Sequence, residues 1–438
     1  MITTTAGRYH GAARRVSVPS AYRGGVAVAL ISIGVALLPL LQPAGPGNSS
    51  VVDAVFVLAL GATLLWVGSA GLRVHIPYVV PVSILVGAGT VAGVLGASPS
   101  TSGIALLQDV GLLMWCATVA NVARSEGALS TILGVWCWSA IFWAGILVLA
   151  VSFQQTGLAG ITQREGTRAA LTFGNPNTAA TYLVISFMLL LASRRPRHVL
   201  ARAAGLALIA VAIALTGSLA GIAGLAAALV VAAVVRVHQH QGAVPAAGSL
   251  FLFAIVGGLA LFGANQLDLP ARSRASSHPL LRDSIGRLDQ SVGSRDLLVS
   301  ESIDLFRSGG LHGLVGRGPA MTKTSLKSVQ APYANEAHND FLAVLVERGV
   351  FGVVGLVLLG AGLAVRVARI SSRGLSPGYA SVVPRPGALA GAVVALGLSS
   401  LSHEILHFRH TWVLFGIIAA LHLWGGPPER NPVRGAAA

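Results

Sequence analysis

The sequence predicts an all-α integral membrane protein with about twelve transmembrane helices. Hydrophobic residues occupy 54% of the 438 positions, charged residues only 10%, and the mean hydropathy is +0.74. Soluble domains carry roughly 25% charged residues, so the composition excludes that class. The chain also contains 53 glycines, and small residues are typical of closely packed membrane helices.

Apolar runs, each close to the ~20 residues that a helix needs to cross the hydrocarbon core, divide the chain. A basic segment, 1–23, precedes nine runs within 24–267, and a polar tail, 426–438, follows three runs within 341–425. The long hydrophilic segment 268–340 separates the two groups. The runs lie near 24–41, 51–71, 76–97, 103–123, 128–152, 171–193, 198–216, 219–236, 247–267, 350–368, 387–404 and 409–425.

Arginines in the short loops predict the orientation. The outer loops near 42–50, 97–102 and 217–218 contain no Lys or Arg. By the positive-inside rule, both termini are therefore cytoplasmic, and the segments 153–170 and 268–340 are outside. This placement explains the net charge of +15 without nucleic acid as a partner. The inner arginines are Arg8, Arg14, Arg15, Arg23, Arg73, Arg124, Arg194, Arg195, Arg197, Arg202, Arg236, Arg366, Arg369, Arg373, Arg385, Arg430 and Arg434.

The outer segment 268–340 has its own pattern. Apolar residues recur at helical spacing over 297–306 beside acidic residues, which predicts an amphipathic helix at the outer membrane surface. A glycine-rich loop, 309–319, follows, and such a loop can expose backbone N–H groups to an anion. It lacks the order of a Walker loop, so ATP binding is not indicated. One or two arginines of this segment can bind a phosphate bidentately, among Arg272, Arg274, Arg282, Arg287, Arg295 and Arg317.

A polar stretch at 335–342 leads into the tenth apolar run. It predicts a short helix with Asn335 as N-cap and Gly349 as its end. His338 then lies in the first turn, where the helix dipole disfavours the imidazolium and attracts anions. Glu336 and Asp340 act in the opposite direction on the same imidazole. Two interpretations follow: a histidine base beside a bound phosphate, or a cap on a re-entrant helix.

These residues resemble a known family. His338-Asn339, followed after nine residues by Gly349-Val350-Phe351-Gly352, resembles the periplasmic His motif of the O-antigen ligase and O-antigen polymerase superfamily. Gly316-Arg317-Gly318-Pro319 is similar to the glycine-rich loop upstream of that motif. The layout, with a large outer loop before the last three spans, also resembles that of the family.

Two shorter stretches extend the resemblance, and one departs from it. Arg168 with Thr172–Asn177 resembles the family's segment after the first outer loop, and Gly293-Ser294-Arg295 resembles the arginine that opens the large loop. Leu219, in Thr216-Gly217-Ser218-Leu219, stands where the family commonly has arginine. If that arginine binds the lipid pyrophosphate, Arg168 or Arg164 must replace it here.

The resemblance implies a GT-C-like, metal-independent glycosyltransferase without a nucleotide cofactor. Its donor is a polyprenyl-diphosphate-linked glycan, and its acceptor is a hydroxyl of a glycan, lipid or protein outside the cytoplasmic membrane. His338 is the expected base, or orients the acceptor, and Glu336 orients His338 or the acceptor. The expected pyrophosphate and glycan contacts are Arg168, Arg295, Arg317, Asn175, Asn177 and Asn339.

Other polar residues in apolar surroundings leave alternatives open. Asp53 is interfacial, whereas Asp109 is deeper and has no partner nearby in sequence, so it is either functional or a packing hydrogen bond. The residues 403–410, with three histidines, are either a metal site or a polar loop that faces the active cavity. Cys116 and Cys137 lie in apolar runs and are expected to be packing residues.

The sequence does not separate a ligase from a polymerase of lipid-linked repeat units. A transporter is a further alternative because many have twelve spans, and Asp109 with Pro77 and Pro81 is the hint in its favour. A scaffold in cell-wall synthesis is the last alternative. The structured outer segment favours an enzyme that acts on long substrates.

Overall fold

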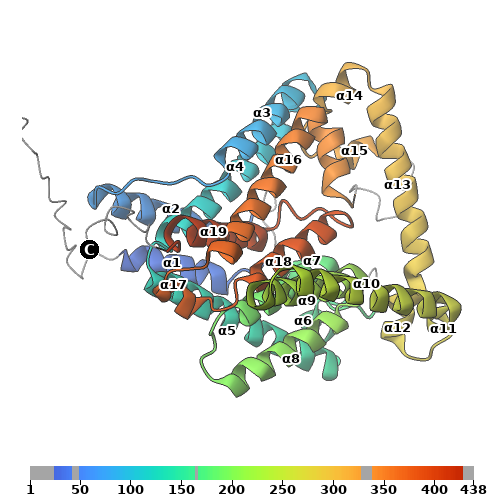
Figure 1. The fold of residues 1–438 in the computed structure, drawn as a ribbon. Coiled ribbons are helices and arrows are strands. Elements are labelled where there is room, and N and C mark those ends of the chain that lie inside the picture. Colours follow the sequence, from blue (N-terminus) through green and yellow to red (C-terminus); the bar gives the residue numbers. More distant parts are fainter. Residues whose placement is uncertain (1–23, 42–48, 163–165, 327–337, 428–438) are drawn as a thin grey trace, which may run out of the picture.

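The structure, a computed structural model, describes residues 24–41, 49–162, 166–326 and 338–427. In this part of the chain the regular elements are helices, and no strand occurs. The prediction of an all-α protein is therefore confirmed. Figure 1 shows long helices gathered into a bundle, with helix α13 along one edge.

Each predicted apolar run contains one main helix. These helices are α1 (Gly25–Ala36), α2 (Val51–Ser69), α3 (Val79–Leu95), α4 (Pro99–Val122), α5 (Glu126–Ser152), α7 (Pro176–Ala192), α8 (Val199–Leu215), α9 (Leu219–Gln241), α10 (Ala243–Gln266), α16 (Asp340–Arg373), α18 (Gly387–Ser400) and α19 (Arg409–Trp424). Among the described residues, six are long and apolar enough to cross a membrane, namely α2, α4, α5, α9, α10 and α16. Twelve spans and the GT-C-like arrangement remain predictions.

The long helices pack as two groups that are in contact with each other. In one group α9 lies along α18, and α7 packs against both α8 and α18. In the other group α16 lies along α3, and α19 lies along α4. Small residues permit these close approaches: a Cβ on Gly391 of α18 would stand 2.3 Å from the carbonyl oxygen of Ala228 on α9. The two groups share one continuous apolar core.

Short elements fill the connections. The first outer loop contains α6 (Thr156–Ala159), the 3-10 turn η3 (Leu171–Phe173) follows it, and α17 (Pro377–Val382) precedes α18. The outer segment contains α11 (Leu269–Arg274), α12 (Pro279–Asp283), η4 (Ile285–Arg287), α13 (Leu288–Ser308), α14 (Leu311–Val315) and α15 (Thr322–Ser325).

The predicted amphipathic helix is confirmed as α13, which extends from α11 and α12 to α14 (Figure 1). Its Leu298 is buried against Leu326 and against Ala343 of α16. The neighbouring Leu297 is 57% exposed. One face of α13 therefore packs on protein, and its contact with the membrane surface stays a prediction.

The predicted short helix at 335–349 is wrong at its start and confirmed at its end. Helix α16 begins at Asp340, and its first part ends at Gly349, where the backbone is not helical (φ 63°, ψ −162°) and a kink leads into the second part, which ends at Arg373. Only glycine fits there, because a Cβ would stand 2.0 Å from the carbonyl oxygen of Leu314 and positive φ strains other residues. Asn335 lies outside the described residues.

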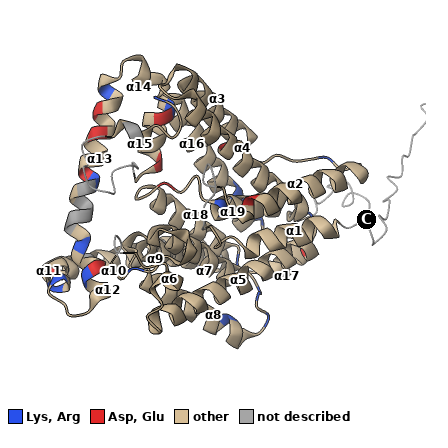
Figure 2. Ribbon diagram, turned by 180° about the vertical axis from the view of Figure 1, so that it is seen from behind, with Lys and Arg blue, Asp and Glu red and all other residues tan. Residues whose placement is uncertain are grey.

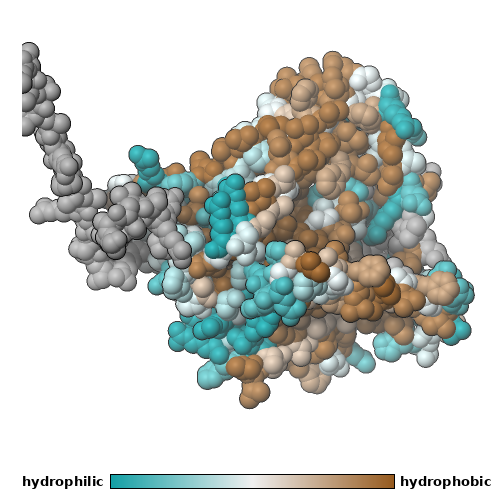
Figure 3. Space-filling view, viewed as in Figure 1, coloured by the Kyte–Doolittle hydropathy of each residue, from teal (hydrophilic) through white to brown (hydrophobic). Residues whose placement is uncertain are grey.

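Charge and hydropathy are distributed unevenly over the fold. Charged residues gather on α11–α14 and at helix ends, whereas α3, α9 and α10 have almost none (Figure 2). In Figure 3, hydrophilic surface at the lower left and along α13 at the right is separated by hydrophobic surface. This pattern fits a multi-pass membrane protein with two polar ends. Which end is cytoplasmic rests on the arginine pattern and remains a prediction.

Candidate functional site

Arg168 lies at the end of the first outer loop, against the turn between α8 and α9. Its Nε donates a hydrogen bond to the carbonyl oxygen of Thr216 (3.1 Å), and one terminal nitrogen donates to Oδ1 of Asn177 (3.0 Å). Ser218 Oγ donates to the same Asn177 oxygen (2.8 Å). Glycine at position 217 permits this close approach, because a Cβ added there would stand only 3.0 Å from Cγ of Arg168. The guanidinium thus lies at the turn that leads into Leu219.

The two asparagines of this region have different positions. Asn175 is the N-cap of α7, and its Oδ1 accepts a hydrogen bond from the backbone N–H of Asn177 (2.8 Å). An N-cap satisfies a backbone donor that the helix leaves open, so Asn175 has a structural role. Asn177 joins Arg168 to Ser218 and therefore fixes the α7 and α9 starts to the loop.

The first outer loop is also tied to the outer segment. Asp283 of α12 accepts hydrogen bonds from the backbone N–H and the hydroxyl of Thr167, both at 2.9 Å. Burial acts to raise the pKa of Asp283, but the hydrogen bonds from Thr167 and Arg282 outweigh it and hold that pKa below its usual value. The carboxylate therefore stays ionised and holds the loop that carries Arg168.

His338 precedes helix α16 instead of lying in its first turn as predicted. It is half-buried and has a positive φ of 50°. Asn339 is the N-cap: its Oδ1 accepts from the backbone N–H groups of Phe341 (2.9 Å) and Leu342 (3.2 Å), and its amide donates to the carbonyl oxygen of Leu401 (3.3 Å). Asn339 thus caps α16 and contacts the end of α18, and its binding of substrate stays a prediction.

Asp340 was predicted only as a neighbouring charge, and the structure gives it a larger part. It is 2% exposed and accepts hydrogen bonds from the backbone N–H groups of Ile405 (3.1 Å) and Leu406 (3.3 Å). It therefore anchors the loop between α18 and α19 to the start of α16. The sequence signal for this role is an acidic residue next to an apolar run. The sequence does not show which backbone N–H groups such a residue will contact.

His403, in the loop after α18, is the residue that connects the two parts of the site. It is 5% exposed, with Nε2 3.0 Å from Oγ1 of Thr181 and Nδ1 3.0 Å from Oγ of Ser402. Thr181 in turn donates to the carbonyl oxygen of Asn177 (3.0 Å). A chain of polar contacts therefore runs from Arg168 through Asn177 and Thr181 to His403.

Two predicted site residues, Arg295 and His338, lie near His403. Burial lowers the pKa of His403 to about 3, with further contributions from Arg295, His338 and His407, in that order. His403 is therefore neutral near pH 7. Charge effects fade beyond about 10 Å, so Arg295 of α13 and His338 lie in the region of His403. The hydrogen bond from Asn339 to the carbonyl oxygen of Leu401 also brings the start of α16 to the loop that carries His403.

Arg295 itself is half-buried, and burial lowers its pKa from the usual value. Among the residues that the structure describes, no carboxylate forms an ion pair with it. A cation that is partly desolvated and near two histidines is suited to an anionic ligand.

Arg317 lies in a different part of the outer segment. Its backbone N–H donates to the carbonyl oxygen of Val346 (2.9 Å), and Gly318 N–H donates to that of Glu347 (3.0 Å). Gly316 and Gly318 have positive φ values of 94° and 108°, which glycine adopts readily. The glycine-rich loop thus supports the kink of α16, and a role of the Arg317 side chain in anion binding stays a prediction. Glu336 and Arg164 lie outside the described residues.

The acids inside the apolar runs have arginine partners. Asp109 has no partner nearby in sequence, but in the fold it forms an ion pair with Arg348 (2.6 Å). Arg409 forms a bidentate ion pair with Asp53: its Nε donates to Oδ1 (3.0 Å) and its Nη2 donates to Oδ2 (2.5 Å). Cys116 and Cys137 are buried free thiols, as expected for packing residues. Within the described ranges, no group of three His, Cys, Asp or Glu residues has an arrangement that could hold a metal ion.

Residues 204–357 match a family model described as O-Antigen ligase. No curated protein sequence matches the chain. The family match confirms the resemblance predicted from the sequence. It spans α8 to the middle of α16 and includes Arg295, Arg317 and His338, whereas Arg168 and His403 lie outside it. The match, together with the apolar helices, supports an O-antigen ligase-like or polymerase-like membrane protein that processes glycans.

Proposed function

Because residues 204–357 match the O-antigen ligase family, we propose that the protein is a membrane glycosyltransferase. It transfers a glycan from a polyprenyl-diphosphate carrier to an acceptor hydroxyl at the outer face of the cytoplasmic membrane. The observation that carries the proposal is the buried His403, which is linked to Arg168 through Thr181 and Asn177 and whose pKa is lowered by the charges of Arg295 and His338. Two guanidinium groups beside a histidine suit a reaction whose leaving group is a diphosphate.

The donor pyrophosphate is held by Arg168 and Arg295 in this proposal. A guanidinium binds phosphate oxygens bidentately, and it stabilises charge that develops on the departing diphosphate. Arg168 also compensates for Leu219, which stands where the family commonly has arginine. Its guanidinium contacts the turn 216–218 directly, so it can occupy the space that an arginine side chain at 219 would otherwise reach.

The reaction forms a bond between the acceptor oxygen and the anomeric carbon and breaks the bond between that carbon and the phosphate oxygen. The diphosphate leaves with the electron pair of the broken bond, and the acceptor hydroxyl loses its proton. His338 is the base that takes this proton, and Glu336 orients it. His403 is a positioning residue in this scheme, because it is buried behind Thr181 and stays neutral.

The ion pair between Asp109 and Arg348 weakens the main hint of a transporter. A carboxylate whose charge is already compensated gives less support for an ion pathway. Ligase and polymerase differ in the acceptor alone, since in a polymerase the acceptor is a second lipid-linked glycan. The same outer site serves either reaction.

A comparison of glycolipids tests the proposal. The gene is deleted and restored as wild type or as His338→Ala, and lipid-linked oligosaccharides and surface polymers are profiled by mass spectrometry. We expect polyprenyl-diphosphate glycan to accumulate in the deletion and in the variant, and the missing surface product identifies the acceptor. Loss of chain length alone assigns the polymerase reaction. Absence of any accumulation, with altered uptake of a small solute, contradicts the transferase.

A further inference from the structure

A second polar feature lies at the opposite end of the helices that carry the candidate site. It is a cavity of about 920 Å³, between the end of α7, the start of α8, the end of α9 and the start of α18. The other ends of these four helices carry Asn177, Thr216, Ser218 and Leu401 of the candidate site. The cavity is therefore separate from that site.

Six arginines from different segments line this cavity. Among the described residues that form its wall, none is acidic. The positive-inside rule explains why arginines occur at this end, but it does not explain their convergence on one cavity. Arg194, Arg195 and Arg197 come from the α7–α8 loop, Arg202 from α8, Arg236 from α9 and Arg385 from the α17–α18 loop.

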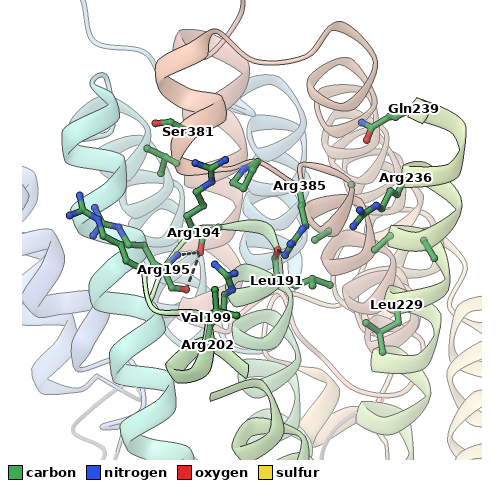
Figure 4. A pocket seen from close by; sticks show the side chains of 18 of the residues that line it. Leu191, Arg194, Arg195, Val199, Arg202, Leu229, Arg236, Gln239, Ser381 and Arg385 are labelled. Atoms are coloured by element: carbon green, nitrogen blue, oxygen red, sulfur yellow. Dashed lines mark hydrogen bonds between the residues drawn. The ribbon is translucent and has the colours of Figure 1, made fainter. Parts of the chain in front are cut away.

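The arginines are close enough to repel one another. Burial lowers the pKa of Arg385, and the charges of Arg202, Arg236 and Arg194 lower it further. In Figure 4 the side chains of Arg194, Arg202, Arg385 and Arg236 surround the opening. An anion placed between them relieves this repulsion, so the uncompensated charge favours an anionic ligand.

The rim of the cavity is fixed by hydrogen bonds. Arg195 donates to the hydroxyl of Ser130, and a terminal nitrogen of Arg385 donates to the carbonyl oxygen of Leu191 (3.3 Å). The backbone N–H of Arg194 donates to the carbonyl oxygen of Val382 (3.2 Å). These bonds connect the two arginine-bearing loops, so the cationic groups are positioned before a ligand arrives.

The remaining wall of the cavity has polar residues, Ser130, Ser193, Gln239, His240 and Ser381, and an apolar part. Leu229 and Ala232 continue along α9 from Arg236 toward the middle of the helix, and Leu191 and Val199 face them from α7 and α8. Leu229 lies about two helical turns, or ~10 Å, from Arg236. A cationic opening next to an apolar strip of the wall matches a phosphate headgroup with its first acyl carbons, whereas a free phosphate would make no contact with that strip.

We propose that this cavity binds the phosphate headgroup of an anionic phospholipid, with an acyl chain against Leu229, Ala232 and Val199. Basic pockets between transmembrane helices at the cytoplasmic side bind lipid headgroups of this kind, and the volume suits a small ligand. The lipid comes from the leaflet at the arginine-rich end, on the other side of the membrane from the glycan donor. The inference does not depend on the glycosyltransferase reaction.

The test uses the full-length protein in detergent and its variant Arg202→Gln/Arg236→Gln. Binding of phosphatidylglycerol, cardiolipin and phosphatidylcholine is measured by native mass spectrometry, and thermal stability is measured at each lipid concentration. We expect wild type to prefer the anionic lipids about tenfold or more over phosphatidylcholine, and the variant to lose that preference. The matched control is Arg73→Gln/Arg369→Gln, which removes two exposed arginines from the same predicted side and should leave the preference intact.

Inorganic phosphate and pyrophosphate distinguish a lipid site from a general anion site. If either binds as tightly as phosphatidylglycerol and displaces it fully, the lipid proposal is overturned. Equal losses in the control variant, or no preference in wild type, also overturn it. Should the double variant fail to fold, Arg236→Gln alone serves instead, because this side chain is exposed; a reduced preference supports the proposal and an unchanged one contradicts it.

Discussion

The two ends of the α7–α8–α9–α18 group both gather arginines, but they hold them differently. At the outer end Arg168 is fixed by Thr216 and Asn177, and polar contacts continue to a buried neutral histidine. At the other end six arginines line an open cavity without an acidic residue in its described wall. The same type of side chain, arginine, therefore has a different role at each end. Fixed partners orient the guanidinium at the outer end, whereas at the other end the arginines surround a cavity that we propose for an anionic lipid headgroup.

The largest effect should come from His338, which belongs to the outer end alone. A general base typically contributes 10²–10⁴-fold in rate, so His338→Ala should lower glycan transfer by about that factor. Accumulation of lipid-linked glycan measures the loss. His278→Ala is the control, because His278 is an exposed histidine of the same outer segment. Undiminished product in His338→Ala would remove the base from the mechanism.

Arg168 should come next. Removing one donor to a developing negative charge costs about 10²–10³-fold, so Arg168→Ala should reduce transfer by roughly 10²-fold. Adding Leu219→Arg to that variant places a guanidinium at the neighbouring helix start, and we expect it to restore part of the rate. Arg307→Ala, an exposed arginine of α13, is the control. A second substitution without any effect on the rate would argue that Arg168 only supports the loop.

Asp340 tests how the outer end is assembled. Asp340→Ala leaves the buried N–H groups of Ile405 and Leu406 without their acceptor, which should cost about 1–3 kcal/mol in the free energy of unfolding. Thermal unfolding of the purified protein measures this as a lower Tm. Asp304→Ala removes an exposed acid of α13 and should leave the Tm nearly unchanged. Equal Tm values for both variants would mean that this anchor is unimportant.

His403 predicts a dependence of stability on pH. The pKa of His403 is about 3 in the folded protein and about 6.5 in an unfolded chain. Because the unfolded state then binds more protons, stability is fully present above pH ~6.5 and declines as the pH falls toward 3. His403→Gln should therefore lose less Tm than wild type between pH 7 and 5. Parallel curves for the two proteins would contradict the buried neutral histidine, and His278→Gln is the control.

The smallest effect is expected at Asp283, which ties the Arg168 loop to α12. The pKa of this carboxyl is held low by Thr167 and Arg282, so its contribution is present near neutral pH and is lost as the pH falls through the folded pKa. Asp283→Asn keeps one acceptor and should cost at most ~1 kcal/mol. Faster hydrogen exchange over residues 166–170 is the expected signal. Unchanged exchange there would show that the loop is held by other contacts.

The fold class and most helix positions could be predicted from the sequence because hydropathy and segment length are local properties. Each apolar run contains a helix, and the amphipathic pattern over 297–306 lies within α13. The error at the start of the helix predicted over 335–349 has a local cause, whereas the predicted end at Gly349 is confirmed. Asn335 and Asn339 both have the chemistry of an N-cap, and the carbonyl of Leu314, which makes glycine necessary at 349, comes from a separate element.

The sequence by itself determined that the chain is a helical membrane protein, which segments are apolar, and which residues resemble the O-antigen ligase family. Only the tertiary structure decided which polar groups meet. His403 and Thr181 are 222 residues apart, and Arg409 and Asp53 are 356 apart. Burial energies depend on composition and can be read along the chain. Hydrogen bonds and ion pairs require atoms within a few ångströms, so the partners of Arg168, Asp109 and Asp340 follow from packing alone.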